Sequence, residues 1–267
     1  MCEPVLESRF GKVATLRLNR PETRNALSRI MIAALHTAID RLGQDAEVHA
    51  IVLAAEGPVF CAGHDLKEIT AARDAKDAGR GFFKDIMAEC AAMMQAIVTC
   101  PKPVIAAVQG TATAAGCQLV ASCDLAMASD NAQFATPGVN IGLFCSSPMV
   151  ALSRNVPRKH AMEMLLTGVP IAAEEANQMG LVNRVVAPES LMSETEALAQ
   201  QIASKSPKTL RIGKEAFYVQ AEMTLAKAYQ YAAKVMVTNL LERDAQEGIG
   251  AFVEKRTPEW DPLEPKS

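Results

Sequence analysis

The chain has 267 residues, 49% of them hydrophobic and 21% charged, which is enough for one large buried core. Its net charge of −3, without a tight Lys/Arg cluster, argues against a nucleic-acid partner. No apolar run approaches the ~20 residues that span a bilayer, and the N-terminus, Met1-Cys2-Glu3-Pro4, does not resemble a secretory signal. We therefore expect a cytoplasmic protein with no membrane partner.

The first two-thirds of the chain alternate strand-like and helix-like segments. Alternating apolar residues predict a half-buried strand over 12–19, and apolar runs predict buried strands over 49–54 and 104–108. Ser28 is a good N-cap for a helix that ends at Gly43, and the apolar residues Met31, Leu35, Ile39 and Leu42 form a stripe along it near the helical period. Together these segments predict an α/β core.

The segment 67–81 is charged and rich in alanine, which predicts a mobile or locally helical insertion and a candidate lid. Helices are predicted over 82–98 and 114–122, and a strand over 125–128. After Pro148 helices dominate, with one short strand at 181–186. These later helices are predicted at about 149–155, 158–166, 172–179, 188–204, 207–221, 223–240 and 242–255.

Seven cysteines, at positions 2, 61, 90, 100, 117, 123 and 145, form an odd set without a Cys-x-x-Cys pair. Neither a disulfide framework nor a metal site is predicted, and we expect reduced, mostly buried thiols.

Two turns rich in small residues, at 60–67 and 109–118, each follow a strand-like run. Each could direct a bare backbone N–H into a cleft. Two convergent N–H groups, one at a turn and one at the positive end of a helix, would stabilise an oxyanion that develops on a bound carbonyl.

These turns resemble those of the crotonase family, also called the enoyl-CoA hydratase/isomerase family. Further matching motifs are Asn19-Arg20-Pro21, Asn25-Ala26-Leu27, 103–108, Ala121-Ser122-Cys123-Asp124, Gln133-Phe134, 163–168, Gly180-Leu181-Val182 and 251–256. The resemblance implies an α/β fold with a crotonase-like spiral of ββα units over 1–200 and a C-terminal helical trimerisation region over 201–267. It also implies an acyl-CoA thioester as partner, a homotrimer or hexamer, and no cofactor besides the coenzyme A of the substrate.

By this resemblance the two oxyanion N–H groups belong to His64 and Ala115. The family usually has glycines at 114–116, and only a helical or extended backbone suits alanine there, which agrees with a helix start. The ring of His64 either transfers protons or only helps to position the turn. Asp65 is expected to stabilise that turn.

Hydratases of the family carry two catalytic glutamates, and their positions fall on Gln118 and Gly138 in this sequence. A third position, which carries aspartate in some relatives, falls on Ser146. A carboxamide cannot accept a proton from water and glycine has no side chain, so we expect a weak hydratase or altered chemistry. Covalent catalysis by Cys117 or Cys145 is not favoured, because no basic residue adjoins either thiol.

The resemblance places Lys67 beside the CoA moiety, and Phe252 and Lys255 where a neighbouring subunit meets its adenine and phosphates. The substrate-binding set predicted in full is Arg24, Ala62, Gly63, Asp65, Leu66, Lys67, Gly116, Ser146, Phe252 and Lys255. Two other interpretations stay open: a non-catalytic acyl-CoA-binding protein, and an enolate-forming enzyme of the decarboxylase type. RNA binding, which one relative performs through a Lys-rich helix, is not expected, because this sequence shows no such helix.

Overall fold

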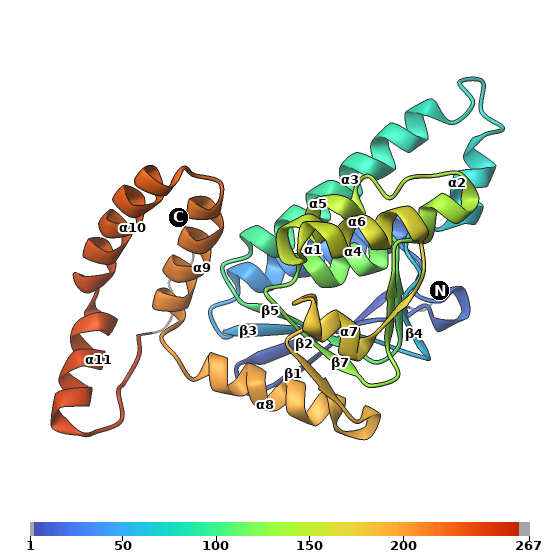
Figure 1. Ribbon diagram of the computed structural model, residues 1–267. Coiled ribbons are helices and arrows are strands. Elements are labelled where there is room, and N and C mark those ends of the chain that lie inside the picture. Colours follow the sequence, from blue (N-terminus) through green and yellow to red (C-terminus); the bar gives the residue numbers. More distant parts are fainter. Residues whose placement is uncertain (1–2, 262–267) are drawn as a thin grey trace.

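The computed structural model describes residues 3–261 and arranges them around two β-sheets (Figure 1). In the larger sheet β1 is antiparallel to its neighbour β2, and the other pairs are parallel. Its strands, in spatial order, are β1 (Val5–Phe10), β2 (Val13–Leu18), β3 (Ala50–Ala55), β5 (Val104–Val108), β7 (Leu125–Ser129) and β10 (Arg184–Val186). The smaller sheet contains β4 (Val59–Cys61), β6 (Thr111–Thr113), β8 (Gln133–Ala135) and β9 (Ile171–Ala172).

Successive strands from β3 to β8 alternate between the two sheets. Each of β3, β5 and β7 is followed by a short strand of the small sheet and then by helical structure, so this part of the chain advances as a spiral of ββα units. The helical segments after the small-sheet strands are α2 (Leu66–Ala72) with α3 (Arg80–Thr99), α4 (Ala115–Ser122), and the 3-10 helix η2 (Pro137–Ile141) with α5 (Pro148–Asn155). This order confirms the α/β fold with ββα units.

The main apolar core lies between the sheets and the helices that surround them. Helix α1 (Arg29–Gln44) begins after Ser28, whose Oγ accepts the N–H of Met31, and it buries the apolar stripe that the sequence predicts. A second cluster fills the other face of the large sheet, where α8 (Leu191–Ala203) covers it. The remaining short elements are η1 (Pro21–Thr23), α6 (Arg158–Thr167), α7 (Ala173–Gln178) and η3 (Pro188–Ser190).

Three C-terminal helices stand to one side of the two sheets in Figure 1: α9 (Pro207–Ala221), α10 (Leu225–Leu240) and α11 (Arg243–Glu254). Helix α9 is tied to the core by Lys214, whose Nζ lies 2.7 Å from Oδ2 of Asp124 and also donates to two backbone carbonyl groups. Tyr218 donates to the other oxygen of Asp124 at 2.9 Å. None of the side chains of α10 is buried in the described chain.

The structure differs from the sequence prediction mainly in the second sheet. Strands β4, β6, β8 and β9 were not predicted, because two or three residues are too few to show a periodicity. Strand β1 of the large sheet was also not predicted, and β2, which was expected to be half-buried, is buried along almost its whole length. The segment 67–81 contains most of the short helix α2 and the start of α3, and its proposed lid motion stays a prediction. Helix α8 crosses residue 200, and the division of the chain at that point also stays a prediction.

The six cysteines between residues 61 and 145 are buried free thiols, whereas Cys2 lies outside the described residues. Across residues 3–261, no helix has the length and apolar character that a membrane span requires.

Candidate active site

The candidate site lies at one edge of the small sheet. Strands β4, β6 and β8 are parallel neighbours, so their carboxyl ends share this edge. Cys61 at the end of β4 pairs with Ala112, and Thr113 at the end of β6 pairs with Ala135. Ligands of α/β proteins commonly bind outside the carboxyl ends of parallel strands. The residues that follow these three ends include all four predicted catalytic residues.

The turn after β4 approaches the first residue of α4. A Cβ atom placed on Gly63 would lie 3.1 Å from the backbone nitrogen of Ala115 and 3.0 Å from the Cβ of Ala114. Gly63 also has a φ of +83°, which L-residues rarely adopt. Glycine is thus required here on two grounds, and its absent side chain allows His64, the next residue, to lie close to the start of α4.

The turn is held by hydrogen bonds that leave the N–H of His64 unused. The N–H of Leu27 donates to the carbonyl of Gly63 at 2.7 Å, and the N–H of Asp65 donates to the carbonyl of Leu27 at 3.4 Å. In such a parallel bridge the N–H of the intervening residue points to the opposite side. Within residues 3–261 neither this N–H nor that of Ala115 has a hydrogen-bond acceptor.

Helix α4 begins unusually close to β4. A Cβ on Gly116 would lie 2.1 Å from the carbonyl oxygen of Cys61, so only glycine fits. Ala114, just before the helix, has φ +50° and ψ −118°. The expectation that alanine occupies only helical or extended backbone here is therefore met by Ala115 and wrong for Ala114, whose conformation is strained for a residue with a Cβ.

Three buried polar atoms without a partner in the described chain belong to α4 or to segments that meet its start: Nε2 of His64, Oε1 of Gln118 and Oγ1 of Thr136. Gln118 lies one turn into α4, and helical side chains lean toward the N-terminus of their helix, which brings its amide toward Ala115. Thr136 follows Ala135, whose carbonyl accepts the N–H of Ala114 at 2.9 Å. Buried polar atoms nearly always have partners, so this trio indicates a site for a polar ligand group or water.

No role was assigned to Thr136 from the sequence. It lies two residues before Gly138, which falls on a position that carries a catalytic glutamate in the family, and this proximity was the available signal.

Space beside Gly138 is already filled. A Cβ on Gly138 would lie 2.8 Å from the carbonyl oxygen of Leu143 and 2.9 Å from Sγ of Cys145. Burial raises the pKa of the Cys145 thiol, and burial raises the pKa of Cys117 to about 12. Both residues are therefore neutral thiols at physiological pH.

The predicted binding residues fall into two groups. Leu66 and Lys67 are exposed on the first turn of α2, and the carboxylate of Asp65 caps that helix by accepting the N–H groups of Lys67 and Glu68. Ala62 donates its N–H to the carbonyl of Arg24 at 3.1 Å, which places the exposed Arg24 beside the same turn.

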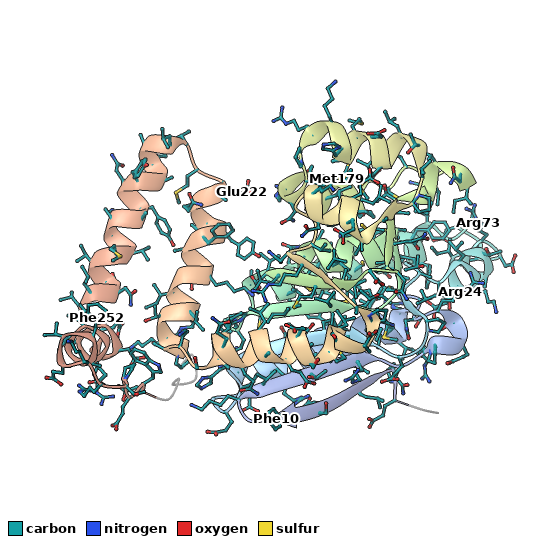
Figure 2. The ribbon with its side chains drawn as sticks, turned by 60° about the horizontal axis from the view of Figure 1, so that its bottom comes forward. Phe10, Arg24, Arg73, Met179, Glu222 and Phe252 are labelled. Carbon is teal, nitrogen blue, oxygen red and sulfur yellow. The ribbon has the colours of Figure 1, made fainter. Side chains whose placement is uncertain are left out.

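The other group lies apart from this turn in a single chain. Phe252 is 85% exposed in α11, and Lys255 follows the end of that helix. Figure 2 shows Phe252 and Arg24 at opposite ends of the molecule. Ser146 is exposed in the segment between η2 and α5.

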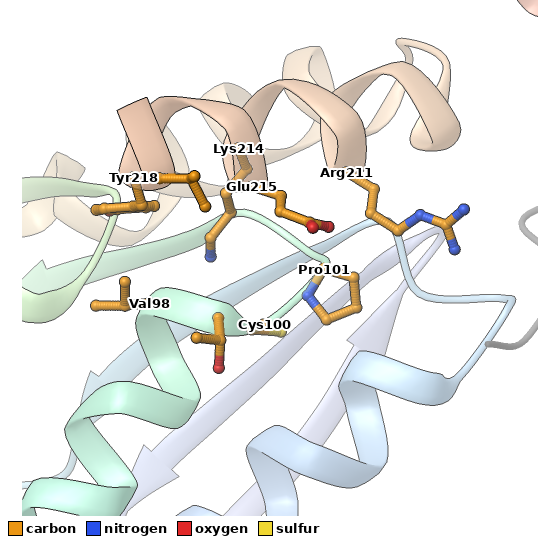
Figure 3. A pocket seen from close by; sticks show the side chains of 9 residues that line it. Val98, Cys100, Pro101, Arg211, Lys214, Glu215 and Tyr218 are labelled. Atoms are coloured by element: carbon orange, nitrogen blue, oxygen red, sulfur yellow. The ribbon is translucent and has the colours of Figure 1, made fainter. Parts of the chain in front are cut away.

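A cavity of about 290 Å³ lies away from these residues, between the end of α3 and helix α9 (Figure 3). Its wall includes Cys100, Arg211, Lys214 and Tyr218, none of which the sequence marked as functional.

Comparisons with known proteins agree with the fold. The family model described as enoyl-CoA hydratase/isomerase matches residues 9–262. The mitochondrial enoyl-CoA hydratase domain-containing protein 3 of Rattus norvegicus is 48% identical over 93% of this chain and 81% of its own length. The crystal structure of the human protein of the same name has 47% identity and a TM-score of 0.92 over 96% of this chain and all of that one. An enoyl-CoA hydratase structure from Mycobacterium smegmatis has 50% identity and a TM-score of 0.91, over 96% of this chain and 98% of that one.

The predicted cytoplasmic location is wrong by these comparisons. The relatives from rat, frog and human are all named as mitochondrial proteins. The cytoplasmic prediction rested on the composition of one short segment, and the names of these relatives outweigh it.

Proposed function

Since the chain belongs to the enoyl-CoA hydratase/isomerase family, we propose that it is an enzyme of acyl-CoA thioesters. The backbone N–H groups of His64 and Ala115 bind the thioester oxygen and stabilise the negative charge that develops on it. The observation that carries this proposal is the close approach of Gly63 to the nitrogen of Ala115, together with two N–H groups that lack acceptors in the described chain. The reaction needs no cofactor besides the coenzyme A of the substrate.

The chemistry of this enzyme is enolate formation with weak hydration. Two N–H donors favour any step in which the thioester carbonyl becomes an enolate. Gln118 and Gly138 supply no carboxylate to activate water, and each positioned acid or base typically contributes about 10²–10⁴ in rate. Crotonyl-CoA hydration should therefore be orders of magnitude slower than in a relative with two glutamates, and a rate within about tenfold of such a relative would contradict this reasoning.

A substitution at Ala115 tests the proposed oxyanion site. Proline is well tolerated at the first position of a helix, and there its ring carbon Cδ replaces the hydrogen of the N–H in question. We expect Ala115→Pro to lower turnover by about 10²–10³ and to reduce the infrared shift of a bound ¹³C-labelled thioester carbonyl. Ala115→Gly keeps the N–H and is the matched control. Equal carbonyl shifts in the two variants would refute the assignment.

We also propose that the chain assembles as a homotrimer or hexamer through its C-terminal helices. Large exposed apolar side chains gather there, and a face of this kind on a folded protein indicates an interaction surface. They are Phe217, Val219, Leu225, Tyr229, Met236, Val237, Leu240, Leu241, Ile249, Phe252 and Val253. Sedimentation of wild type and Leu240→Glu tests this, since the variant should have a lower mass.

A further inference from the structure

The candidate site contains one side chain that can exchange a proton near neutral pH. Of its three unpartnered buried atoms, the hydroxyl of Thr136 and the amide of Gln118 cannot act as bases. The third, Nε2 of His64, belongs to a ring that accepts a proton when it is neutral. Burial lowers the pKa of His64, so the ring is neutral at physiological pH.

Other acids close to the turn are already engaged. The carboxylate of Asp65 caps α2, and Glu68 accepts the backbone N–H of Arg29 at 2.9 Å. Glu89, on α3, accepts the Nε–H of Arg29 at 2.9 Å. These contacts hold the carboxylates on the surface formed by α1, α2 and α3, so none of them is free to replace the missing glutamates.

The remaining titratable groups on the elements around His64 are exposed charged side chains and buried thiols. The cations Arg24 and Lys67 are exposed, and Asp85 is an exposed acid on α3. The thiols Cys61, Cys117 and Cys145 are buried, and burial raises the pKa of each. No thiolate is therefore present to act as the base.

We propose that the imidazole of His64 transfers the proton in this site, while Gln118 and Thr136 orient the water or polar atom that exchanges it. This inference rests on the proposed function, because it needs a carbonyl polarised by the two N–H groups. In the simplest step, Nε2 takes a proton from C2 of the acyl group and the C–H electron pair moves through C1 to the thioester oxygen. The imidazolium then returns a proton to C2, which restores the ring and the thioester.

In hydration of an enoyl thioester the same atoms serve in a second way. The oxygen of water forms the bond to C3, Nε2 accepts one water proton, and the C2=C3 electron pair moves through C1 to the thioester oxygen. The imidazolium then protonates C2, so the product has gained one water and the ring is neutral again. One residue thus supplies both its backbone N–H and its side chain to the reaction.

Exchange of the C2 proton of butyryl-CoA in D2O, followed by mass spectrometry, tests the proposal. His64→Gln removes the imidazole, so we expect exchange to fall by about 10²–10⁴. Because the variant retains the backbone N–H, the Kd for butyryl-CoA should change less than about threefold. His49→Gln is the matched control, because His49 is also buried, and its Nδ1 lies 3.1 Å from the carbonyl oxygen of Ala203, outside the site. It should exchange like wild type.

Two further measurements separate proton transfer from a structural role. Added imidazole should restore exchange in His64→Ala, and the wild-type rate should fall at acid pH with a midpoint below 6.5 that the variant lacks. Unchanged exchange in folded His64→Gln, or no rescue of folded His64→Ala, would overturn the role of the ring.

The carbonyl shift of bound ¹³C-labelled butyryl-CoA distinguishes the two proposals. A shifted carbonyl without any C2 exchange in the wild type would refute the role of His64 and leave the oxyanion site standing. An unshifted carbonyl would refute the proposed function itself.

Discussion

Replacing Gly116 by alanine should separate the two N–H donors of the proposed oxyanion site. The new Cβ would lie 2.1 Å from the carbonyl oxygen of Cys61, 2.8 Å from its carbonyl carbon and 2.9 Å from its Cβ. All three atoms belong to the end of β4 or sit directly on its backbone. No rotation of a flexible side chain relieves the collision, so α4 and β4 must move apart.

The size of the effect follows from that distance. Ordinary contact begins at 3.4 Å, so the two atoms must separate by about 1.3 Å. A misplacement of about 1 Å is enough to lower a rate by about 10². Overpacking typically costs about 1–3 kcal/mol, while alanine in place of helical glycine returns about 1 kcal/mol. We therefore expect a folded variant with a modest loss of stability and a large loss of carbonyl polarisation.

Two assays on one preparation check this prediction. Urea unfolding gives the change in stability, and the infrared shift of a bound ¹³C-labelled thioester reports the N–H donors. Gly213→Ala is the matched control, because a Cβ on that exposed residue of α9 meets nothing within 4 Å. The reasoning is refuted if Gly116→Ala polarises the carbonyl as strongly as Gly213→Ala does.

Three other predictions concern stability, each measured by urea unfolding. Lys214→Met leaves the part-buried carboxylate of Asp124 without its cation and should cost up to about 3–5 kcal/mol, and the double variant Lys214→Met with Asp124→Asn should recover part of that loss. Ala114→Gly should stabilise the protein by about 1 kcal/mol, because glycine adopts φ +50° without strain; a loss of stability would contradict this. Burial lowers the pKa of His49 and His64, so the unfolded chain binds more protons below pH 6.5. The free energy of unfolding should be highest above pH 6.5 and should decrease below it, by up to about 1.4 kcal/mol per pH unit for each histidine. The decrease should be shallower in His49→Gln, which has lost one of the two groups.

The sequence predicts the long elements of this fold well. Helix α1 was expected from its Ser28 cap and apolar stripe, and the structure confirms both. The small sheet was not predicted, although it positions the site. Its strands owe their conformation to pairing with segments far away in the sequence, such as Thr113 with Ala135, and a three-residue segment carries no pattern of its own.

Some features of the candidate site were likewise predictable from the sequence and others were not. The two turns drew attention to His64 and Ala115 because small residues allow close backbone approach, a property that a sequence displays directly. The unpartnered state of Nε2 of His64 and Oγ1 of Thr136 depends on what surrounds those atoms in space. A local sequence pattern does not show whether a side chain lacks a hydrogen-bond partner, so the role proposed for the His64 ring could be argued only from the three-dimensional structure.

At Gly138 the surrounding backbone, and not only the residue type, leaves no room for a carboxylate side chain. The carbonyl oxygen of Leu143 and Sγ of Cys145 occupy the space that a side chain at this position would need. The N–H of Leu143 also donates to the carbonyl of Gly138 at 2.9 Å, so the following segment is folded against the glycine. A glutamate placed here would first have to displace that segment. Under the proposed function, proton transfer would therefore come from another element, for which the turn after β4 offers the imidazole of His64.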